Sequence, residues 1–157
     1  MSLINDLRDR GQSLCVAESL TGGALASALV DVPGASEVFL GGVVVYTIQA
    51  KREVLGVCEE DLVHGVVSRE VAMAMARRAR ELFASDYAIS TTGVAGPGPH
   101  EGVEPGTVWL GFASKLGIGA TRLNLEGDRK AVRAAAVSVA LELLASRAGF
   151  ARFGERS

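Results

Sequence analysis

The sequence has few aromatic residues, cysteines and histidines, and no long run of apolar residues or of one charge. Aromatic residues make up 5% of the 157 residues, and no basic cluster is interleaved with them, so nucleic acid is not an expected partner. The two cysteines, Cys15 and Cys58, form no CxxC pair and have no metal-ligand spacing with His64 or His100. We therefore expect neither a metal site nor a disulfide.

The absence of a membrane-spanning apolar run and of a signal peptide predicts a cytoplasmic protein that does not bind membranes. The composition is 48% hydrophobic and 22% charged, with a formal net charge of −2, which is typical of a globular chain. Its length and its alanine, valine and glycine content favour a tightly packed α/β protein. We expect residues 1–157 to form a single domain.

Apolar periodicity and turn residues divide the chain into alternating helices and strands. Helices are predicted at residues 2–10, 24–30, 49–55, 69–84 and 129–147, and strands at 14–16, 39–46, 87–92, 107–114 and 120–125. The strand at 39–46 is almost wholly apolar, which predicts that helices cover both of its faces. Helix-linked strands are usually parallel, and the last two should form an antiparallel hairpin. The fold class is therefore α/β: a three-layer α/β/α sandwich with a mixed, mostly parallel sheet of about five strands.

The stretch Ala17-Glu18-Ser19-Leu20-Thr21-Gly22-Gly23 lies between the first predicted strand and the following helix. Backbone N–H groups at a helix start lack partners within the helix and favour negative charge. Ser19 could therefore be a helix cap, a phosphate ligand, or a nucleophile beside oxyanion donors. Taken alone, the frequency of serine at helix N-caps favours the cap.

The next two strands end in Tyr46 to Lys51 and in Gly93-Val94-Ala95-Gly96-Pro97. If these strands are parallel, their ends lie with Ser19 around one cleft at the carboxyl edge of the sheet, where α/β proteins bind ligands. Lys51 is a better candidate base than either histidine, because a partly desolvated amine can take a serine proton. Tyr46 could relay that proton or hold the amine.

Each of these residues also has a purely structural interpretation. Lys51 could be a solvated surface lysine, and Tyr46 an aromatic side chain packed at a strand end. The Gly93–Pro97 segment could be only a tight turn, or its N–H groups could bind phosphate or ribose. Arg129, at the start of the last helix, could reach an anion or stay solvated.

Together with Gly106-Thr107-Val108-Trp109 and Gly127-Asp128-Arg129, these motifs resemble the CinA C-terminal domain family from about Leu14 to Leu144. That family includes stand-alone PncC-type nicotinamide-nucleotide amidases. The resemblance implies hydrolysis of the carboxamide of nicotinamide mononucleotide (NMN) to nicotinate mononucleotide and ammonia, with no metal or other cofactor. Its fold agrees with the sandwich predicted above. A homo-oligomer, with a dimer favoured, is the expected assembly.

The resemblance also implies a role for individual residues. Ser19 would be the nucleophile, activated by Lys51 with Tyr46. Oxyanion or phosphate donors would come from Thr21, Gly22 and Gly23. The remaining substrate-binding positions would be Gly93, Ala95, Gly96, Thr107 and Arg129.

Two positions depart from the family pattern. The family usually has Ser-Asn after the tyrosine, where this chain has Thr47-Ile48, and a lysine before the proline of its long loop, where this chain has Glu104. These departures leave open a non-catalytic, nucleotide-binding protein associated with competence or damage. Many family members also carry an upstream nucleotide-hydrolysing domain, which is missing from this sequence, so we expect no pyrophosphatase activity.

Overall fold

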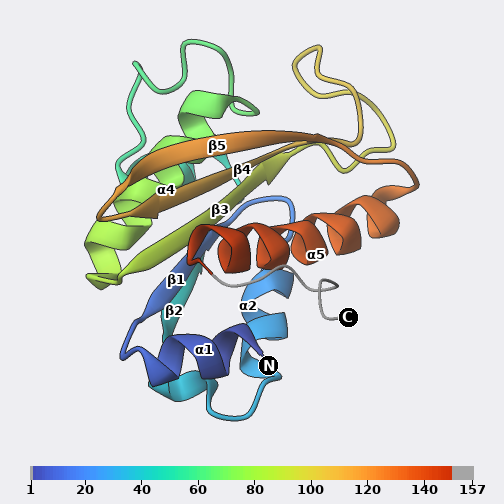
Figure 1. Cartoon of the computed structure of the whole chain (residues 1–157). Helices are drawn as coiled ribbons and strands as arrows, with labels where there is room; N and C mark the ends of the chain where they lie inside the picture. Colours follow the sequence, from blue (N-terminus) through green and yellow to red (C-terminus); the bar gives the residue numbers. More distant parts are fainter. Residues whose placement is uncertain (1, 150–157) are drawn as a thin grey trace.

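The structure, a computed structural model, describes residues 2–149, which form five α-helices, one 3-10 helix and five strands (Figure 1). In chain order these are α1 (Leu3–Asp9), β1 (Leu14–Glu18), α2 (Ala24–Val30), η1 (Ala35–Glu37), β2 (Phe39–Val44), α3 (Ile48–Leu55), α4 (Arg69–Phe83), β3 (Tyr87–Gly93), β4 (Thr107–Ser114), β5 (Gly117–Asn124) and α5 (Arg129–Arg147). The predicted order of helices and strands is confirmed.

The five strands form one mixed sheet in the order β2-β1-β3-β4-β5. The strand β1 pairs in parallel with β2 and β3, whereas β4 is antiparallel to both β3 and β5. Four strands therefore run in one direction and β4 runs against them, as the mixed sheet predicted from the sequence requires. The carboxyl ends of β1, β2 and β3 meet at the same edge.

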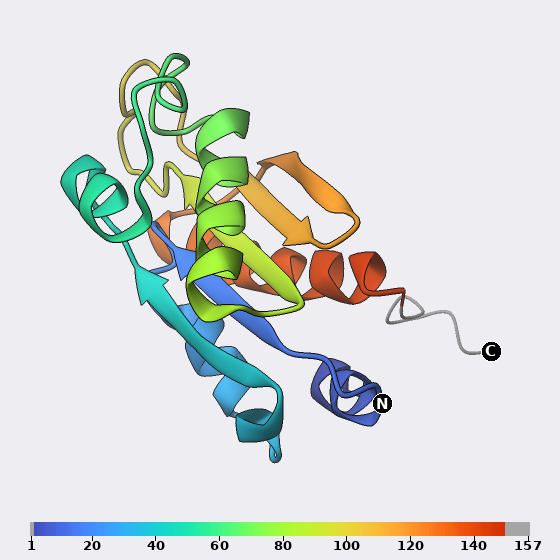
Figure 2. The same ribbon diagram turned by 90° about the vertical axis from the view of Figure 1, so that its left-hand side faces the viewer.

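Alternating side chains of β1 supply two separate cores. Leu14 and Val16 pack with α1, α2 and α5, whereas Cys15 and Ala17 pack with α3 and α4. Figure 2 shows α4 crossing in front of the sheet, with α2 and α5 behind it. At Gly111 in β4 a Cβ atom would lie 2.0 Å from the carbonyl oxygen of Ala72 in α4. Only glycine lets this helix approach the sheet so closely.

Polar side chains begin four of the five α-helices. The N-cap side chain accepts a hydrogen bond from the backbone N–H three residues later at the starts of α1, α3, α4 and α5: these are Ser2, Thr47, Ser68 and Asp128. In α4 the helical spacing of Val71, Met75, Ala79 and Leu82 predicts that all four are buried, but Leu82 is 57% exposed. Phe83 instead packs against β2, where its ring lies over Gly41.

Two expectations about the edges of the sheet were also wrong. The strand β2 is not covered on both faces: it is an edge strand, and its residues alternate between half-buried and exposed. Its apolar run therefore comes partly from exposed Leu40 and Val44. The strand β5 begins at Gly117 rather than at Ala120, because glycines leave no side-chain alternation to read in its first residues. Within residues 2–149, no helix is long and apolar enough to cross a bilayer.

Candidate active site

A cavity of about 360 Å³ lies at the carboxyl edge of the sheet. Its lining includes Ser19 after β1, Tyr46 and Lys51 after β2, and the Gly93–Pro97 segment that ends β3. The prediction that these three strand ends surround one cleft is confirmed. The ionisable lining residues are Tyr46, Lys51, His100 and Arg129, and none of the described lining residues carries a carboxylate.

The Lys51 amine lies directly against the Ser19 hydroxyl. The Lys51 side chain is fully buried, and its Nζ donates hydrogen bonds of 2.9 Å to Ser19 Oγ and 2.9 Å to the carbonyl oxygen of Val45. The position follows from the local sequence, because Thr47 begins α3 and Lys51 then lies one turn inside this helix. Lys51 is therefore not a solvated surface lysine.

Burial changes the chemistry of this lysine. It lowers the pKa of Lys51 from the usual 10.5 to about 8, because the charged form is poorly solvated there. No carboxylate within residues 2–149 forms an ion pair with Lys51 that would restore the charge. Near neutral pH a useful fraction of the amine is thus unprotonated and can accept the Ser19 proton.

The Ser19 backbone is fixed to β3 by Thr91. The Ser19 N–H donates to the Thr91 carbonyl oxygen at 3.0 Å and to Thr91 Oγ1 at 3.2 Å. Thr91 Oγ1 also shares a hydrogen bond of 2.8 Å with Thr21 Oγ1, and both threonines are buried. Thr91 was not among the residues predicted from the sequence, although the run Ser90-Thr91-Thr92 in a predicted buried strand was a signal. Polar side chains inside such a strand need partners.

The interpretation of Ser19 as a helix cap was wrong. The N-cap of α2 is Gly23, with φ 102°, which has no side chain of its own to cap the helix. Instead, the buried carboxylate of Glu18 accepts hydrogen bonds from the N–H groups of Leu25 (2.8 Å) and Ala26 (3.1 Å). The turn through Gly22 and Gly23, both with positive φ, delays the helix start, so Ser19 directly follows β1 and does not begin α2. The start of α2 favours a negative charge, and the Glu18 carboxylate of the protein supplies it.

Tyr46 and Arg129 bridge two sides of the cavity. Arg129 donates to the Tyr46 hydroxyl at 2.9 Å and to the carbonyl oxygen of Gly96 at 2.8 Å. Tyr46 is 56% exposed, so it is not packed in the core, and among the described residues its hydroxyl bonds to Arg129 rather than to Lys51 or Ser19. The structure thus places Tyr46 in the cavity but not in direct contact with the serine–lysine pair.

The other residues predicted to bind substrate fall into two groups. Gly93, Ala95 and Gly96 line the cavity. The lining does not include Thr21, Gly22, Gly23 and Thr107. Thr107 instead supports the Gly93 turn, since its carbonyl oxygen accepts the Val94 N–H at 2.9 Å.

Arg133 is a further polar residue beside Ser19, and it was not among the residues predicted from the sequence. It lies four residues after Arg129 on α5, and its guanidinium donates to the carbonyl oxygens of Leu20 (2.9 Å) and Thr21 (3.1 Å). The spacing from Arg129 was the available signal, because residues four apart share one face of a helix.

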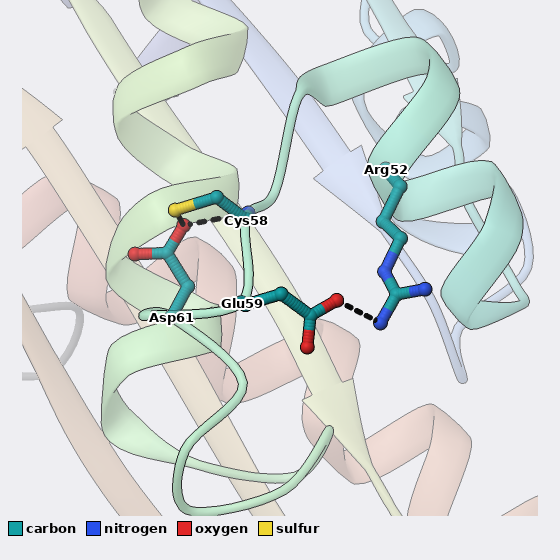
Figure 3. Close-up of polar contacts among 4 residues, drawn as sticks. All are labelled: Arg52, Cys58, Glu59 and Asp61. Atoms are coloured by element: carbon teal, nitrogen blue, oxygen red, sulfur yellow. Dashed lines mark hydrogen bonds and ion pairs between the residues drawn. The ribbon is translucent and has the colours of Figure 1, made fainter.

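The environments of the two cysteines disfavour their thiolate forms. Both thiols are free. Burial raises the pKa of Cys15 to about 11. Figure 3 shows Cys58 on the loop after α3, where its Sγ donates to Asp61, while Arg52 pairs with Glu59 nearby. Hydrogen bonds to the carboxylates of Glu60 and Asp61 raise the pKa of Cys58, so its thiolate is disfavoured.

The fold and the cavity define an α/β domain with a buried serine–lysine pair at the carboxyl edge of its sheet. The model of the CinA C-terminal domain matches residues 1–148, and the chain belongs to this family. It is 44% identical over 140 residues to a CinA-like protein of Thermotoga maritima, covering 88% of this chain and 34% of that protein. A CinA-like protein of Frankia casuarinae is 45% identical over 139 residues, with 88% and 32% covered.

Solved structures of family members have the same fold. Competence damage-inducible protein A from Klebsiella pneumoniae superposes with a TM-score of 0.89 at 37% identity, covering 92% of this chain and 91% of that one. A CinA superfamily protein from Escherichia coli gives 0.85 at 37% identity, with 88% and 82% covered. The chain spans about a third of the length of the curated relatives it matches.

Proposed function

We propose that this chain hydrolyses the carboxamide of nicotinamide mononucleotide, giving nicotinate mononucleotide and ammonia. The observation that carries the proposal is the 2.9 Å hydrogen bond between Lys51 Nζ and Ser19 Oγ inside the cavity. A hydroxyl against a buried amine of lowered pKa is a known way to activate a serine for attack on an amide. Among amides, nicotinamide mononucleotide is chosen as the substrate for two reasons. The family resemblance implies it, and a cavity lining without carboxylates suits a ligand that carries a phosphate.

In the first half of the reaction Ser19 Oγ attacks the carboxamide carbon, and its proton passes to the neutral Lys51 amine. Backbone N–H groups of the turn after Ser19 stabilise the negative charge on the carbonyl oxygen. The C–N bond then breaks, and the Lys51 ammonium donates its proton to the leaving nitrogen. Ammonia departs and leaves an ester between the nicotinoyl group and Ser19.

In the second half a water molecule attacks this ester. Lys51, neutral again, takes a proton from the water, and the ester bond to Ser19 breaks. The Ser19 oxygen recovers its proton from Lys51, and nicotinate mononucleotide is released. The bridge of Arg129 to Tyr46 and to Gly96 positions the bound nucleotide against this pair.

Ammonia release from nicotinamide mononucleotide tests the proposal directly. The wild type should turn the nucleotide over, and Ser19→Ala should abolish turnover while still binding the nucleotide in titration calorimetry. Free nicotinamide and glutamine serve as control amides. Absence of wild-type turnover, or retention of turnover by Ser19→Ala, would refute the assignment.

A second candidate is a nucleotide-binding module without catalysis. It is favoured by Ile48 and by Glu104, which place an apolar side chain and a carboxylate where the family usually has an amide and a lysine. Calorimetry that shows nucleotide binding by a wild type without ammonia release would select this candidate.

A further inference from the structure

His100 differs from the other polar residues that line the cavity, because its side chain has no partner in the described part of the chain. The described lining residues with a polar side chain are Ser19, Tyr46, Lys51, Thr92, His100 and Arg129. Five of them are already paired: the serine with the lysine, the tyrosine with the arginine, and the threonine with the carbonyl oxygen of Val66. The imidazole of His100 forms no hydrogen bond and no ion pair with any residue in 2–149. Its ring nitrogens are therefore free to bind a ligand.

The cavity has a closed reactive end and an open end. Ser19 and Lys51 are buried, whereas Tyr46, His100 and Arg129 are exposed. The volume of about 360 Å³ is near the lower limit for ligand sites, which is roughly 300 Å³. A ligand of nucleotide size that places an amide against Ser19 therefore fills the cavity and extends to the exposed residues.

The backbone of His100 is fixed by a two-residue turn. Its N–H donates to the Val103 carbonyl oxygen at 3.0 Å, and the Val103 N–H donates to the His100 carbonyl oxygen at 2.8 Å. Glu101 and Gly102, between them, both have positive φ, 49° and 74°, as such a tight turn requires. The Glu101 carboxylate accepts the N–H of Val66, another lining residue, at 3.5 Å. Backbone contacts thus hold His100 at the cavity, and its side chain takes no part in them.

The exposed end of the cavity suits a ligand with a negative charge. Two carboxylates follow His100 on the same loop, Glu101 and Glu104, but neither lines the cavity. The exposed lining consists instead of Arg129, Tyr46, His100 and segment 97–99, which has no polar side chain. An imidazole donates an N–H whether it is neutral or protonated, and phosphate oxygens are strong acceptors. The far end of the ligand therefore meets one cation and one unpaired donor.

We propose that His100 is a specificity-determining residue of this cavity, which donates a hydrogen bond to the phosphate of a ligand whose amide lies at Ser19. The inference rests on the proposed function for the position of the amide. It goes beyond that function by naming the side chain that distinguishes a nucleotide from the corresponding nucleoside. Loss of His100 therefore weakens binding of the phosphate-bearing ligand and leaves the chemistry at Ser19 intact.

Nicotinamide mononucleotide and nicotinamide riboside differ only in the phosphate, so the pair isolates this contact. Titration calorimetry measures the binding of both to the Ser19→Ala chain, with and without His100→Ala. Loss of the donor should raise the Kd of the nucleotide about 10-fold, the size of one hydrogen bond to a charged group, and leave the Kd of the nucleoside unchanged. His64→Ala is the matched control, because His64 is exposed, lies 3.4 Å from the Glu70 carboxylate and is not in the lining.

Kinetics of the chain with Ser19 intact give a second measurement. His100→Ala should raise KM for nicotinamide mononucleotide about 10-fold and leave kcat near that of the wild type. His100→Gln, whose amide keeps an N–H donor, should retain part of the preference for the nucleotide. His64→Ala should match the wild type. The His100 variants should keep the wild-type midpoint in urea denaturation, because only backbone atoms of His100 bond within the loop.

The inference is overturned if the preference for nucleotide over nucleoside survives His100→Ala, if this substitution weakens both ligands equally, or if His64→Ala has the same effect. Ammonia release by the wild type together with an unchanged preference in His100→Ala would refute the inference alone. Nucleotide binding that depends on His100, in a wild type that releases no ammonia, would refute the proposed function alone. A chain that binds neither ligand would refute both.

Discussion

The buried amine of Lys51 should make the stability of the protein depend on pH in a defined window. The pKa of Lys51 is about 8 in the folded protein against 10.5 in an unfolded chain. Between these values the unfolded state binds more protons than the folded state, so the free energy of unfolding rises with pH. Each pKa unit is worth about 1.4 kcal/mol, so burying the charged lysine costs the fold about 3 kcal/mol at low pH.

The substitution Lys51→Met removes this penalty, so the difference in unfolding free energy between the variant and the wild type measures it. The substitution also leaves Ser19 Oγ and the Val45 carbonyl without the lysine, which costs about 1 kcal/mol for each lost hydrogen bond but does not vary with pH. We therefore expect the variant to be close to wild-type stability at pH 7 and less stable than the wild type at pH 10. The difference in unfolding free energy should change by about 2–3 kcal/mol over that interval.

Urea denaturation of both proteins at several pH values between 6 and 10 measures this difference. Other groups that titrate in the window are common to both proteins and cancel in the comparison. Exposed Lys130→Met is the control, and its difference from the wild type should stay flat. A Lys51→Met difference that is equally flat would mean that the wild-type amine is not held with a lowered pKa, and the argument for Ser19 activation would lose its basis.

Three further predictions concern the pH dependence of activity, the start of α2 and the packing of α4 on the sheet. First, kcat/KM of the wild type should rise with pH and level off above an apparent pKa of about 8, as Lys51 loses its proton; a profile that is flat from pH 6 to 9 would contradict a lysine base. Second, Glu18→Gln should lower the free energy of unfolding by about 1–2 kcal/mol in urea denaturation, because a charged acceptor at the start of α2 is lost, and a neutral effect would show that this contact does not stabilise the helix. Third, Gly111→Ala should cost about 3 kcal/mol or more through its clash with α4, whereas Gly119→Ala, with open space around it, should not; equal unfolding midpoints for the two would refute the packing argument.

The fold was largely predictable because local signals and global packing agree. Caps such as Thr47 and Asp128, together with apolar periodicity, placed the helices, and the parallel strand ends then followed from topology. Edge strands were less predictable. Exposed Val44 in β2 and the glycines of β5 give no sequence signal of how much cover neighbouring elements provide.

The reactive residues of the site could be predicted from the sequence, but the residues that hold them in place could not. Ser19 and Lys51 belong to chemically informative segments, so their place around one cleft could be inferred from the strand ends, and their pairing from the family resemblance. Their supports could not, because Thr91 and Arg133 act through backbone atoms of the turn, and nearly any sequence offers such atoms. Glu18 was visible in the motif, but its role depends on α2 beginning at Ala24, one residue after a left-handed glycine.

The carboxylate-free lining of the cavity has a kinetic consequence. The chain as a whole carries a formal charge of −2, yet Arg129 is an exposed cation in the lining, whereas Lys51 lies buried below it. An anionic ligand such as the proposed nucleotide should therefore be attracted to this opening, although the net charge of the chain is slightly repulsive. Such steering acts over roughly the Debye length, about 8 Å at physiological ionic strength, and weakens as salt is added. Under the proposed function, the charge of the nucleotide therefore favours it already during encounter, before any bond is made.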